Sequence, residues 1–446
     1  MDIEEYVRRG FRQGVPEETL GRALADQIRV YKPDEEQEYA ARFAQAVISE
    51  VKNSTGLSGD FFTFHRSGIS MGSFGVGSRG TGDFFAHRQI ARVIGRTGAA
   101  VGVEEMDDAG VVELAEAAQG RYVVCTVDGM HSRLSEFPFL AGFHVTRATL
   151  RDVYVMGARP LMLFSDIHVA DDGDVAKIFE YTAGVTTVGE MMGVPLVSGS
   201  TLRIGGDMVL GERMTGCVGT VGIAQHLTPR RGAAPGDVIM MTEGAGGGTI
   251  ATAAIYSGFP DVVERTINLY FLKAAEALLT SPAIREVHAM TDVTNGGLRG
   301  DVHELAHTAG CRVVIEEKDV RGIADTQVQE MLDALEIDYL GVSLDSLLIV
   351  APGHAVSAIR KVIREAGVRI EEIGRIEEGT PGAYLVMDGK EQDFSPRFRE
   401  SAYTPVKKVV DRHPENLEAM KMAVANAADM AVAKKNRVIR HLKLGE

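Results

Sequence analysis

Apolar residues recur along the chain in two patterns, one typical of strands and one of helices. Tyr122–Val127 is a β-branched, apolar run that predicts a strand, which ends at Asp128. In Ala141–Met156 the apolar residues return at helical spacing, and Gly157 closes the predicted helix. One turn therefore connects a strand-end carboxylate, Asp128, with a carboxylate inside a helix, Asp152.

Asp152 interrupts the apolar side of this predicted helix, where a carboxylate needs a partner. One interpretation is that Asp128 and Asp152 together clamp Mg²⁺, which prefers oxygen ligands. The other is an ordinary turn residue and a helix ion pair with Arg147 or Arg151. Spacing alone leaves both interpretations open, because ion-pair networks imitate functional sites.

The second half of the chain repeats this arrangement. A predicted strand at Asp237–Glu243 leads into the glycine loop Gly244–Gly248 and then a helix, where exposed N–H groups favour anions. Later, a strand brings Asp292 to a glycine turn that precedes another helix.

The glycines at 205–206, in the first half of the chain, predict a hairpin between strands at 196–201 and 216–224. Alternating strands and helices indicate an α/β or α+β protein with two domains.

Both ends of the chain are helical by pattern. Apolar spacing predicts helices through Leu20–Val30 and Tyr39–Val51, and the C-terminal segment has a helical stripe with excess Lys and Arg. We interpret these segments as surfaces that pack on the body or on a protein partner. The predicted division is a helical extension (1–65), an N-terminal α/β domain (66–228), a second α/β domain (229–395) and a basic helical tail (396–446).

The length, net charge and cysteine content of the chain exclude several classes of function. The chain has 446 residues and a net charge of -15, which disfavours nucleic-acid binding because phosphate contacts need clustered Lys and Arg. Its three cysteines lack metal-binding spacing and are typical of buried thiols in a reducing compartment. No apolar run approaches membrane-spanning length. We therefore expect a cytoplasmic protein with no membrane or nucleic-acid partner.

A glycine- and serine-rich segment at 67–82 precedes a helix. Gly75, Gly77 and Gly80 formally match the dinucleotide pattern GxGxxG, but a polar, glycine-rich stretch stands where a buried strand is required. A dinucleotide oxidoreductase is therefore a distant alternative. We interpret the segment as a lid with Arg79 available for an anionic ligand, beside the simpler alternative of a merely mobile loop. Asp107 and Asp108 form an acidic pair in a predicted turn, where both can face one ion or both can be solvated.

Six segments occur in an order that resembles one superfamily. They are MDDAGVV (106–112), VVCTVDGMH (123–131), TLRDVYVMGARP (149–160), LVSGST (196–201), GAAPGDVIMMTEGAGGG (232–248) and HAMTDVTNGGL (288–298). The chain resembles aminoimidazole ribonucleotide synthetase, selenophosphate synthetase, thiamine-monophosphate kinase and the dehydratase-type hydrogenase maturation factor. The resemblance covers roughly residues 66–390. It implies an N-terminal α/β domain that builds a β-barrel across a homodimer, a C-terminal α/β domain, and ATP bound between them through Mg²⁺.

The resemblance also implies roles for individual residues. Asp292 would face the substrate and the terminal phosphate, and His131 and Arg133 are second-rank candidates for phosphate or substrate. His131 has an alternative as a structural residue. The implied metal ligands are Asp107, Asp108, Asp128, Asp152 and Asp292. The implied catalytic residues are Asp292, Asp128 and Arg79, and the implied nucleotide contacts are Gly75, Gly77, Arg79, Gly80, Asp107, Asp128, His131 and Asp152.

Departures from the superfamily narrow the function. Arg151 stands where relatives have Ser or Asn, and Ser200 stands where they have an acidic or polar ligand, for which Asp207 is a conjectural substitute. The nucleophilic cysteines of two relatives are absent from the corresponding segments. The sequence therefore predicts an ATP- and Mg²⁺-dependent enzyme that phosphorylates or activates a small molecule. The alternative is a divergent nucleotide-binding assembly or maturation factor that grips a protein through its terminal helices.

Overall fold

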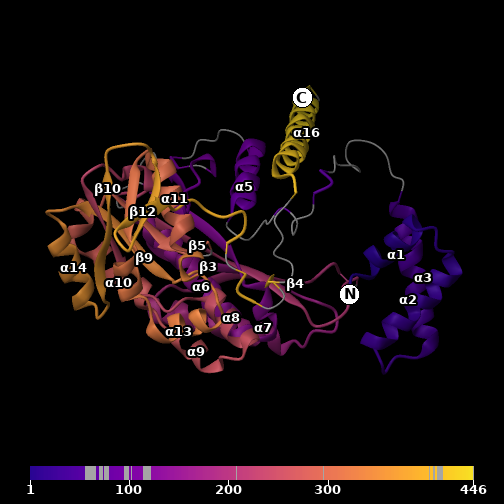
Figure 1. The fold of residues 1–446 in the computed structure, drawn as a ribbon. Helices are drawn as coiled ribbons and strands as arrows, with labels where there is room; N and C mark the ends of the chain where they lie inside the picture. The colour runs from indigo at the N-terminus through magenta and orange to yellow at the C-terminus, as the bar shows by residue number, and fades with distance from the viewer. Residues whose placement is uncertain are drawn as a thin grey trace.

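The computed structural model shows two sheet-based domains with helical segments at either end (Figure 1). The described residues are 1–55, 67–69, 74, 80–94, 100–101, 103–113, 122–206, 208–294, 296–400, 402–404, 407–408 and 415–444. Gly75, Gly77 and Arg79, which were predicted to contact the nucleotide, lie outside them, as does Asp207. Within these ranges no helix is both long and apolar enough to cross a membrane.

The first domain is built on a five-stranded sheet with the order β1-β2-β5-β3-β4. Its strands are Gly110–Glu113 (β1), Tyr122–Gly129 (β2), Arg159–Val169 (β3), Leu196–Arg203 (β4) and Met214–Ala224 (β5). Strands β3 and β4 are parallel, and the other neighbouring pairs are antiparallel. The predicted strand that ends near Asp128 is confirmed as β2. Asp128 is the second-last residue of this strand.

The connection from β4 to β5 differs from the sequence prediction. The glycines at 205–206 predict a hairpin, but β3 lies between the two strands in the sheet. Helix α7 (Ala176–Met192) carries the chain from β3 to β4, and a crossover of this kind makes two neighbouring strands parallel. The predicted hairpin is therefore wrong.

Two helices cover one face of this sheet. Helix α6 (Pro138–Val155) begins with a proline at its first turn and ends before Gly157, whose positive φ of 78° stops the helix. Most α6 side chains are buried, because α6 packs against both the sheet and α7. The predicted helix at Ala141–Met156 is confirmed, with its start three residues earlier.

The other face of the sheet is apolar and exposed. Val127, Phe164, Val197 and Leu202 all present large hydrophobic side chains there or along its edge. In the single chain the sheet is open and is not closed into a barrel. An exposed apolar patch is typical of an interaction surface. The β-barrel across a homodimer would need a second chain on this face and stays a prediction.

The second domain holds a seven-stranded sheet with the order β12-β11-β8-β10-β6-β9-β7. Its strands are Asp237–Thr242 (β6), Ala289–Val293 (β7), Arg312–Glu316 (β8), Ser346–Pro352 (β9), Ile370–Glu377 (β10), Gly382–Met387 (β11) and Lys390–Asp393 (β12). Its α-helices are Gly248–Ser257 (α8), Pro260–Thr266 (α9), Tyr270–Thr280 (α10), Gly297–Ala309 (α11), Glu317–Ile323 (α12), Thr326–Ala334 (α13) and Val356–Glu365 (α14). The apolar strands β7 and β9 lie at the edge that meets α6.

Short 3₁₀ helices occupy several connections. They are Val103–Glu105 (η1), Ser132–Glu136 (η2), Arg230–Gly232 (η3), Pro282–Glu286 (η4) and Tyr339–Gly341 (η5). Two of them lie next to candidate site residues or between the domains. Helix η1 precedes the acidic pair at 107–108, and η3 connects the first domain to the second. Among the described residues before that pair, Val101 makes a β-bridge to Val111.

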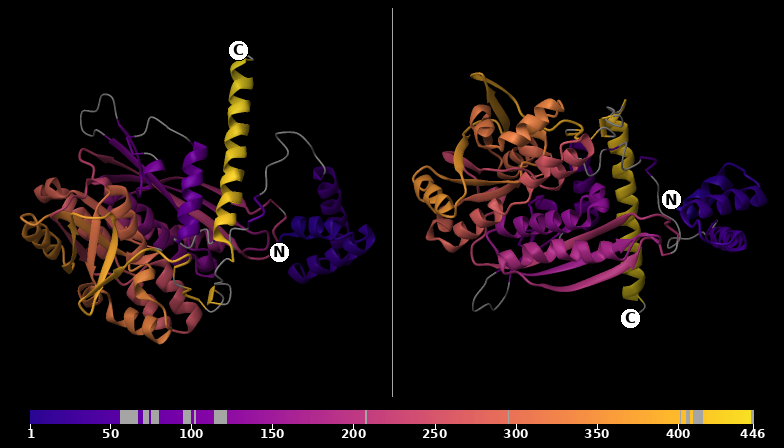
Figure 2. Two further views of the ribbon diagram at one scale, coloured as in Figure 1. Left: turned by 45° about the horizontal axis from the view of Figure 1, so that its top comes forward. Right: turned by 90° about the horizontal axis from the view of Figure 1, so that it is seen from below.

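The N-terminal helices form a small unit with its own core. They are Ile3–Arg12 (α1), Glu17–Tyr31 (α2) and Gln37–Ser54 (α3), so the described residues 1–55 hold one helix more than the two patterns that were singled out. Lys32 ties this unit to the first domain through Asp171 and Asp172, at 2.5 and 2.6 Å. Figure 2 shows the unit set to one side of the body.

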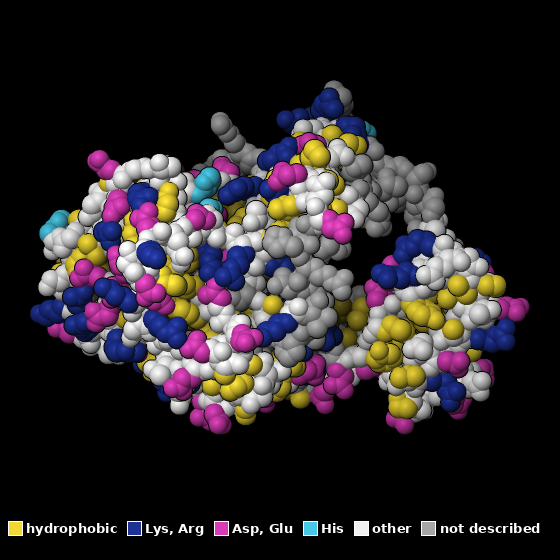
Figure 3. All heavy atoms as spheres, viewed as in Figure 1, with side chains coloured by type: hydrophobic (Ala, Val, Ile, Leu, Met, Phe, Trp, Pro, Cys, Tyr) yellow, Lys and Arg dark blue, Asp and Glu magenta, His cyan; other side chains and the backbone are white. Residues whose placement is uncertain are grey.

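The C-terminal helix α16 (Leu417–Leu444) packs along α5 (Thr81–Ile94) and extends away from the body (Figure 2). Met422, Met430, Ile439 and Leu442 expose large apolar side chains on it. Figure 3 shows apolar and basic side chains intermingled along this helix. Of the tail predicted at 396–446, Leu417–Leu444 is helical, whereas residues 396–400 and 402–404 are not, and Tyr403 belongs to the core of the second domain.

Candidate functional site

A cavity of about 770 Å³ lies between the two domains. Its walls come from the turn before β1, the end of β2, the middle of α6, the start of α8 and the segment after β7. These elements belong to both domains, so the fold places the cavity where one domain meets the other. Clefts between domains are common ligand sites.

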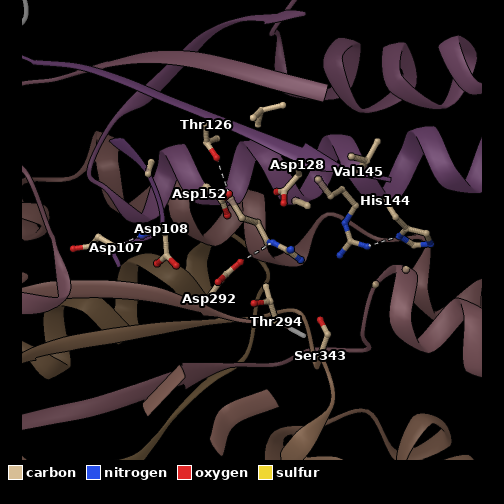
Figure 4. Close-up of a pocket in the computed structure, with 18 of the residues that line it drawn as sticks. Asp107, Asp108, Thr126, Asp128, His144, Val145, Asp152, Asp292, Thr294 and Ser343 are labelled. Carbon is tan, nitrogen blue, oxygen red and sulfur yellow. Dashed lines mark hydrogen bonds and ion pairs between the residues drawn. The ribbon is translucent and has the colours of Figure 1, made fainter. Parts of the chain in front are cut away.

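All five predicted metal ligands line this one cavity. Asp107 and Asp108 come from the turn before β1, Asp128 from β2, Asp152 from α6 and Asp292 from β7. Figure 4 shows the side chains of Asp128, Asp152 and Asp292 grouped together, with the acidic pair beside them. The sequence therefore identified carboxylates that are far apart in the chain and adjacent in the fold.

Asp152 sits among like charges. Its carboxylate accepts a hydrogen bond from the Thr126 hydroxyl at 3.0 Å. Among the described contacts no hydrogen bond or ion pair joins it to Arg147 or Arg151, but the charge of Arg151 acts on it and lowers its pKa in part. Burial raises the pKa of Asp152 well above its ordinary value, and the neighbouring carboxylates of Asp128, Asp292 and Asp108 raise it further. This end of the cavity thus holds more negative charge than the side chains around Asp152 compensate.

Arg230 holds the acidic pair in place. Its Nη2 donates to Asp108 Oδ1 at 2.5 Å and to the Thr291 hydroxyl at 2.7 Å, and its backbone N–H donates to Asp107 Oδ2 at 3.2 Å. Arg230 is 2% exposed. Burial raises the pKa of Asp107 to about 6, against the lowering effect of Arg230 and with a further increase from Asp108. Sequence analysis missed Arg230, because its segment has the composition of a linker.

Three charged residues lie at the opposite end, and sequence analysis missed one of them, Asp345. Arg151 Nε lies 3.2 Å from Asp292 Oδ2, the ion pair that is dashed in Figure 4. Arg147 and Arg151 both form ion pairs with Asp345, which directly precedes β9. Asp345 lies in a stretch without a recognisable motif, so only its place in the fold reveals it.

His131 joins the two domains. Its Nε2 lies 3.1 Å from the Thr249 hydroxyl and its Nδ1 lies 3.3 Å from the Thr252 hydroxyl, both on α8. Burial lowers the pKa of His131 to about 4, with a smaller contribution from Lys407, so the ring is neutral near pH 7. These contacts support the structural interpretation of His131, while a contact with phosphate stays a prediction.

The remaining candidates lie elsewhere. Gly80 packs against the backbone of Phe398, where an added Cβ would come within 2.1 Å of the carbonyl oxygen. Arg133 stacks on the ring of Tyr256, with its guanidinium carbon 4.0 Å from the ring centre. Ser200 is exposed on β4. Among the described residues none of these three contributes to the cavity wall.

The donor set suits a hard divalent cation, because Mg²⁺ prefers carboxylate oxygens and several are available on one wall. In the described part of the chain, however, no three acidic, histidine or cysteine side chains converge closely enough to hold a metal ion. The contacts explain this, since Asp108 is bonded to Arg230 and Asp292 is paired with Arg151. A Mg²⁺ ion held here by one or two of these carboxylates would complete its coordination with phosphate or water oxygens.

Comparisons with known proteins follow this division into domains. Residues 106–224 match the family model described as AIR synthase related protein, N-terminal domain, and residues 234–386 match the corresponding C-terminal domain. Together these matches cover more than half of the chain. The first match ends with β5 and the second begins just before β6.

Similar chains include several curated proteins. An uncharacterised protein of Methanocaldococcus jannaschii is 48% identical over 99% of this chain and 98% of its own length. Selenide, water dikinase of Myxococcus xanthus is 31% identical over 51% of this chain and 62% of its own, less than two thirds. Thiamine-monophosphate kinase of Caulobacter vibrioides is 25% identical over 63% of this chain and 80% of its own.

Solved structures show the same fold. The hydrogenase maturation protein HypE in complex with ATP is 18% identical, with a TM-score of 0.54 over 70% of this chain and 94% of its own. HypE in a HypE–HypF complex is 15% identical, with a TM-score of 0.56 over 69% of this chain and 98% of its own. At these identities the similarity establishes the two-domain α/β architecture.

Proposed function

We propose a function that starts from the family of this protein: the chain belongs to the AIR synthase-related family. On that premise it is an enzyme that uses ATP and Mg²⁺ to phosphorylate or activate an oxygen atom of a small molecule. The observation that carries the proposal is the carboxylate cluster at Asp152, whose pKa is raised by burial and by three neighbouring carboxylates. A divalent cation relieves such repulsion, and a similar fold is known with ATP bound.

The cavity offers what phosphoryl transfer needs. The residues that would hold Mg²⁺ are Asp107, Asp108, Asp128, Asp152 and Asp292. Bound there, the cation would neutralise phosphate charge and align the reacting oxygens. Gly247 and Gly248 bring the first N–H groups of α8 to the cavity, where they favour anionic oxygens. Asp292 lies next to both the acidic cluster and Arg151, so it marks the place where two substrates would meet.

The test is titration calorimetry with ATP and Mg²⁺ on the wild type and on Asp152→Asn. The substitution keeps the shape of the side chain and removes its charge, so we expect metal-dependent ATP binding to fall by more than about 100-fold, which corresponds to losing one charge-assisted ligand in a desolvated site. Asp166→Asn is the matched control, because Asp166 lies on β3 of the same domain with 46% of its side chain exposed.

Two outcomes would overturn this proposal. One is a folded wild type, judged by circular dichroism, that binds no ATP with Mg²⁺ present. The other is Asp152→Asn binding ATP and Mg²⁺ as tightly as Asp166→Asn does.

A second candidate function rests on the terminal helices. Exposed Met422, Ile439 and Leu442 on α16 suit contact with a protein, and one structural neighbour is a complex of HypE with HypF. The chain would then be a nucleotide-binding assembly or maturation factor. Because Tyr403 lies in the core of the second domain, the informative truncation removes only residues 415–446.

ATP turnover separates the two candidates. The enzyme hypothesis expects purified protein to hydrolyse or transfer from ATP with a small molecule alone, before and after truncation. The maturation hypothesis expects turnover only when cell extract is added, and its loss in the truncated protein. Turnover by the truncated protein without extract excludes the second candidate.

A further inference from the structure

The cavity has a basic end, formed by two arginines one helical turn apart on α6. Arg147 and Arg151 are 1% and 7% exposed, and both line the cavity. Both guanidinium groups pair with the single carboxylate of Asp345, which is 2% exposed. Arg151 pairs with Asp292 as well, so two arginines and two carboxylates are buried together, and burying four charges carries a desolvation cost that apolar side chains would not have.

Arg147 has an evident structural task. Its Nη1 donates to the Thr266 carbonyl at 2.8 Å, and its Nη2 lies 3.5 Å from Asn268 Oδ1. These contacts tie α6 to the end of α9 and the residues that follow it. A hydrogen bond to a backbone carbonyl fixes the guanidinium, so Arg147 acts as a positioning residue for whatever lies beside it.

Arg151 is bonded differently. Its described polar partners are two carboxylates only, Asp345 at Nη1 and Asp292 at Nε, and its Nη2 has no described partner. The guanidinium also lies 5.8 Å from the centre of the Phe271 ring, which restricts its plane. An arginine fork that is held on one side and open on the other is suited to bidentate recognition of a carboxylate or phosphate.

Other polar groups face the same region. Thr294 and Ser343 line the cavity near Asp292 (Figure 4), and Thr294 Oγ1 is buried without a hydrogen-bond partner. Gly247, at the start of α8, lies beside Asp345, and an added Cβ there would be in ordinary van der Waals contact with its carboxyl carbon, at 3.8 Å. A hydroxyl donor, a helix N-terminus and an arginine thus surround one volume, and the last two favour negative charge.

We propose that Arg151 binds an anionic group, a phosphate or a carboxylate, of the small-molecule substrate, and that Arg147 and Asp345 hold Arg151 in place. The inference deepens the proposed function, on which it rests, by giving the substrate its chemical class. Asp292, which is paired with Arg151, separates this anion site from the acidic end that would take the cation and the nucleotide. The substrate would then be anchored by its anionic group with its reacting oxygen toward Asp292.

Calorimetry with inorganic phosphate and, separately, with malonate tests this site in buffer that contains neither nucleotide nor divalent cation. We expect the wild type to bind at least one of them, and Arg151→Met to weaken that binding by roughly 10- to 100-fold, the range for losing charge-assisted hydrogen bonds. Arg151→Lys should recover part of the loss, because it restores charge without the fork. Tighter binding of phosphate indicates a phosphorylated substrate, and tighter binding of malonate indicates a carboxylic acid.

Arg159→Met serves as the control, since Arg159 is exposed at the start of β3 and outside the cavity wall. Equal anion binding by the wild type and a folded Arg151→Met overturns the inference, and so does a folded wild type that binds neither anion. Because no nucleotide is present, failure here is distinct from failure of the ATP and Mg²⁺ titration, which judges the proposed function by itself.

Discussion

Two buried arginine clusters border the cavity, and they differ in how their donors are used. In the first, both Nη atoms of Arg230 donate to protein groups, at the Met106 carbonyl, Asp108 and Thr291. In the second, Arg151 contacts carboxylates only, and its Nη2 faces no described partner. Both clusters link the two domains, but the first is closed by backbone and side-chain partners whereas the second leaves donor capacity toward the cavity.

The difference separates a structural charge from a functional one. A buried charge that bonds to backbone and hydroxyl groups is committed to the fold, because moving it would strand those groups. A buried charge paired only with carboxylates can exchange them for an anion of another molecule. On this argument Arg230 fixes the geometry of Asp107 and Asp108, while Arg151 is available to a ligand.

The largest effect on stability is expected from Arg230→Met. Removing the guanidinium leaves the buried carboxylates of Asp107 and Asp108 without their cation, which costs about 3–5 kcal/mol in the free energy of unfolding. Arg231→Met is the matched control at the next residue, because Arg231 is 45% exposed at its side chain and its ion pair with Glu105 contributes only about 0–1 kcal/mol. Chemical denaturation of both variants measures the difference.

Arg151→Met sharpens the contrast between the clusters. Asp345 keeps Arg147 as its partner, so only Asp292 loses its cation, whereas Arg230→Met leaves two carboxylates without theirs. We therefore expect a smaller loss, of about 1–3 kcal/mol. A loss from Arg151→Met as large as that from Arg230→Met would contradict the distinction between the two clusters.

The acidic end was predictable from the sequence, and the arginine clusters were not. The sequence pattern marks the ends of two strands, at Asp128 and Asp292, and a periodic helix that contains Asp152. In the fold these elements meet at the cavity, so the three carboxylates lie together. Arg230 lies in a segment with the composition of a linker. Asp345 lies between η5 and β9, in a segment whose sequence shows neither a periodic pattern nor a recognisable motif. Their roles arise from contacts with residues more than 100 positions away, to which local spacing gives no access.

The order of the strands was also beyond local reasoning. Turn residues at 205–206 suggest a hairpin, yet β4 pairs with β3 and β5 pairs with β2 and β3. Glycines permit a tight turn without deciding which strands become neighbours. The crossover through α7 decides it, because that helix must cover the sheet face that α6 also covers.

The smallest expected effect concerns the proton on Asp107 in the closed cluster. Its pKa is about 6 in the folded protein, raised chiefly by burial, and near its ordinary value of about 3.9 when the chain is unfolded. The folded state therefore holds the proton more tightly. Its contribution to stability is complete below about pH 4 and is lost as the pH rises through about 6.

Unfolding measured with a chelator present, from pH 4 to pH 7, tests this expectation. We expect the wild type to lose on the order of 1–2 kcal/mol across this window relative to Asp107→Asn, which has no proton to lose there. Asp237→Asn is the comparison, since Asp237 is equally buried but pairs with His288 outside the cavity wall. A pH profile of Asp107→Asn parallel to that of the wild type would show that Arg230 keeps Asp107 ionised at every pH, and the closed cluster would then be balanced by charge alone rather than by a retained proton.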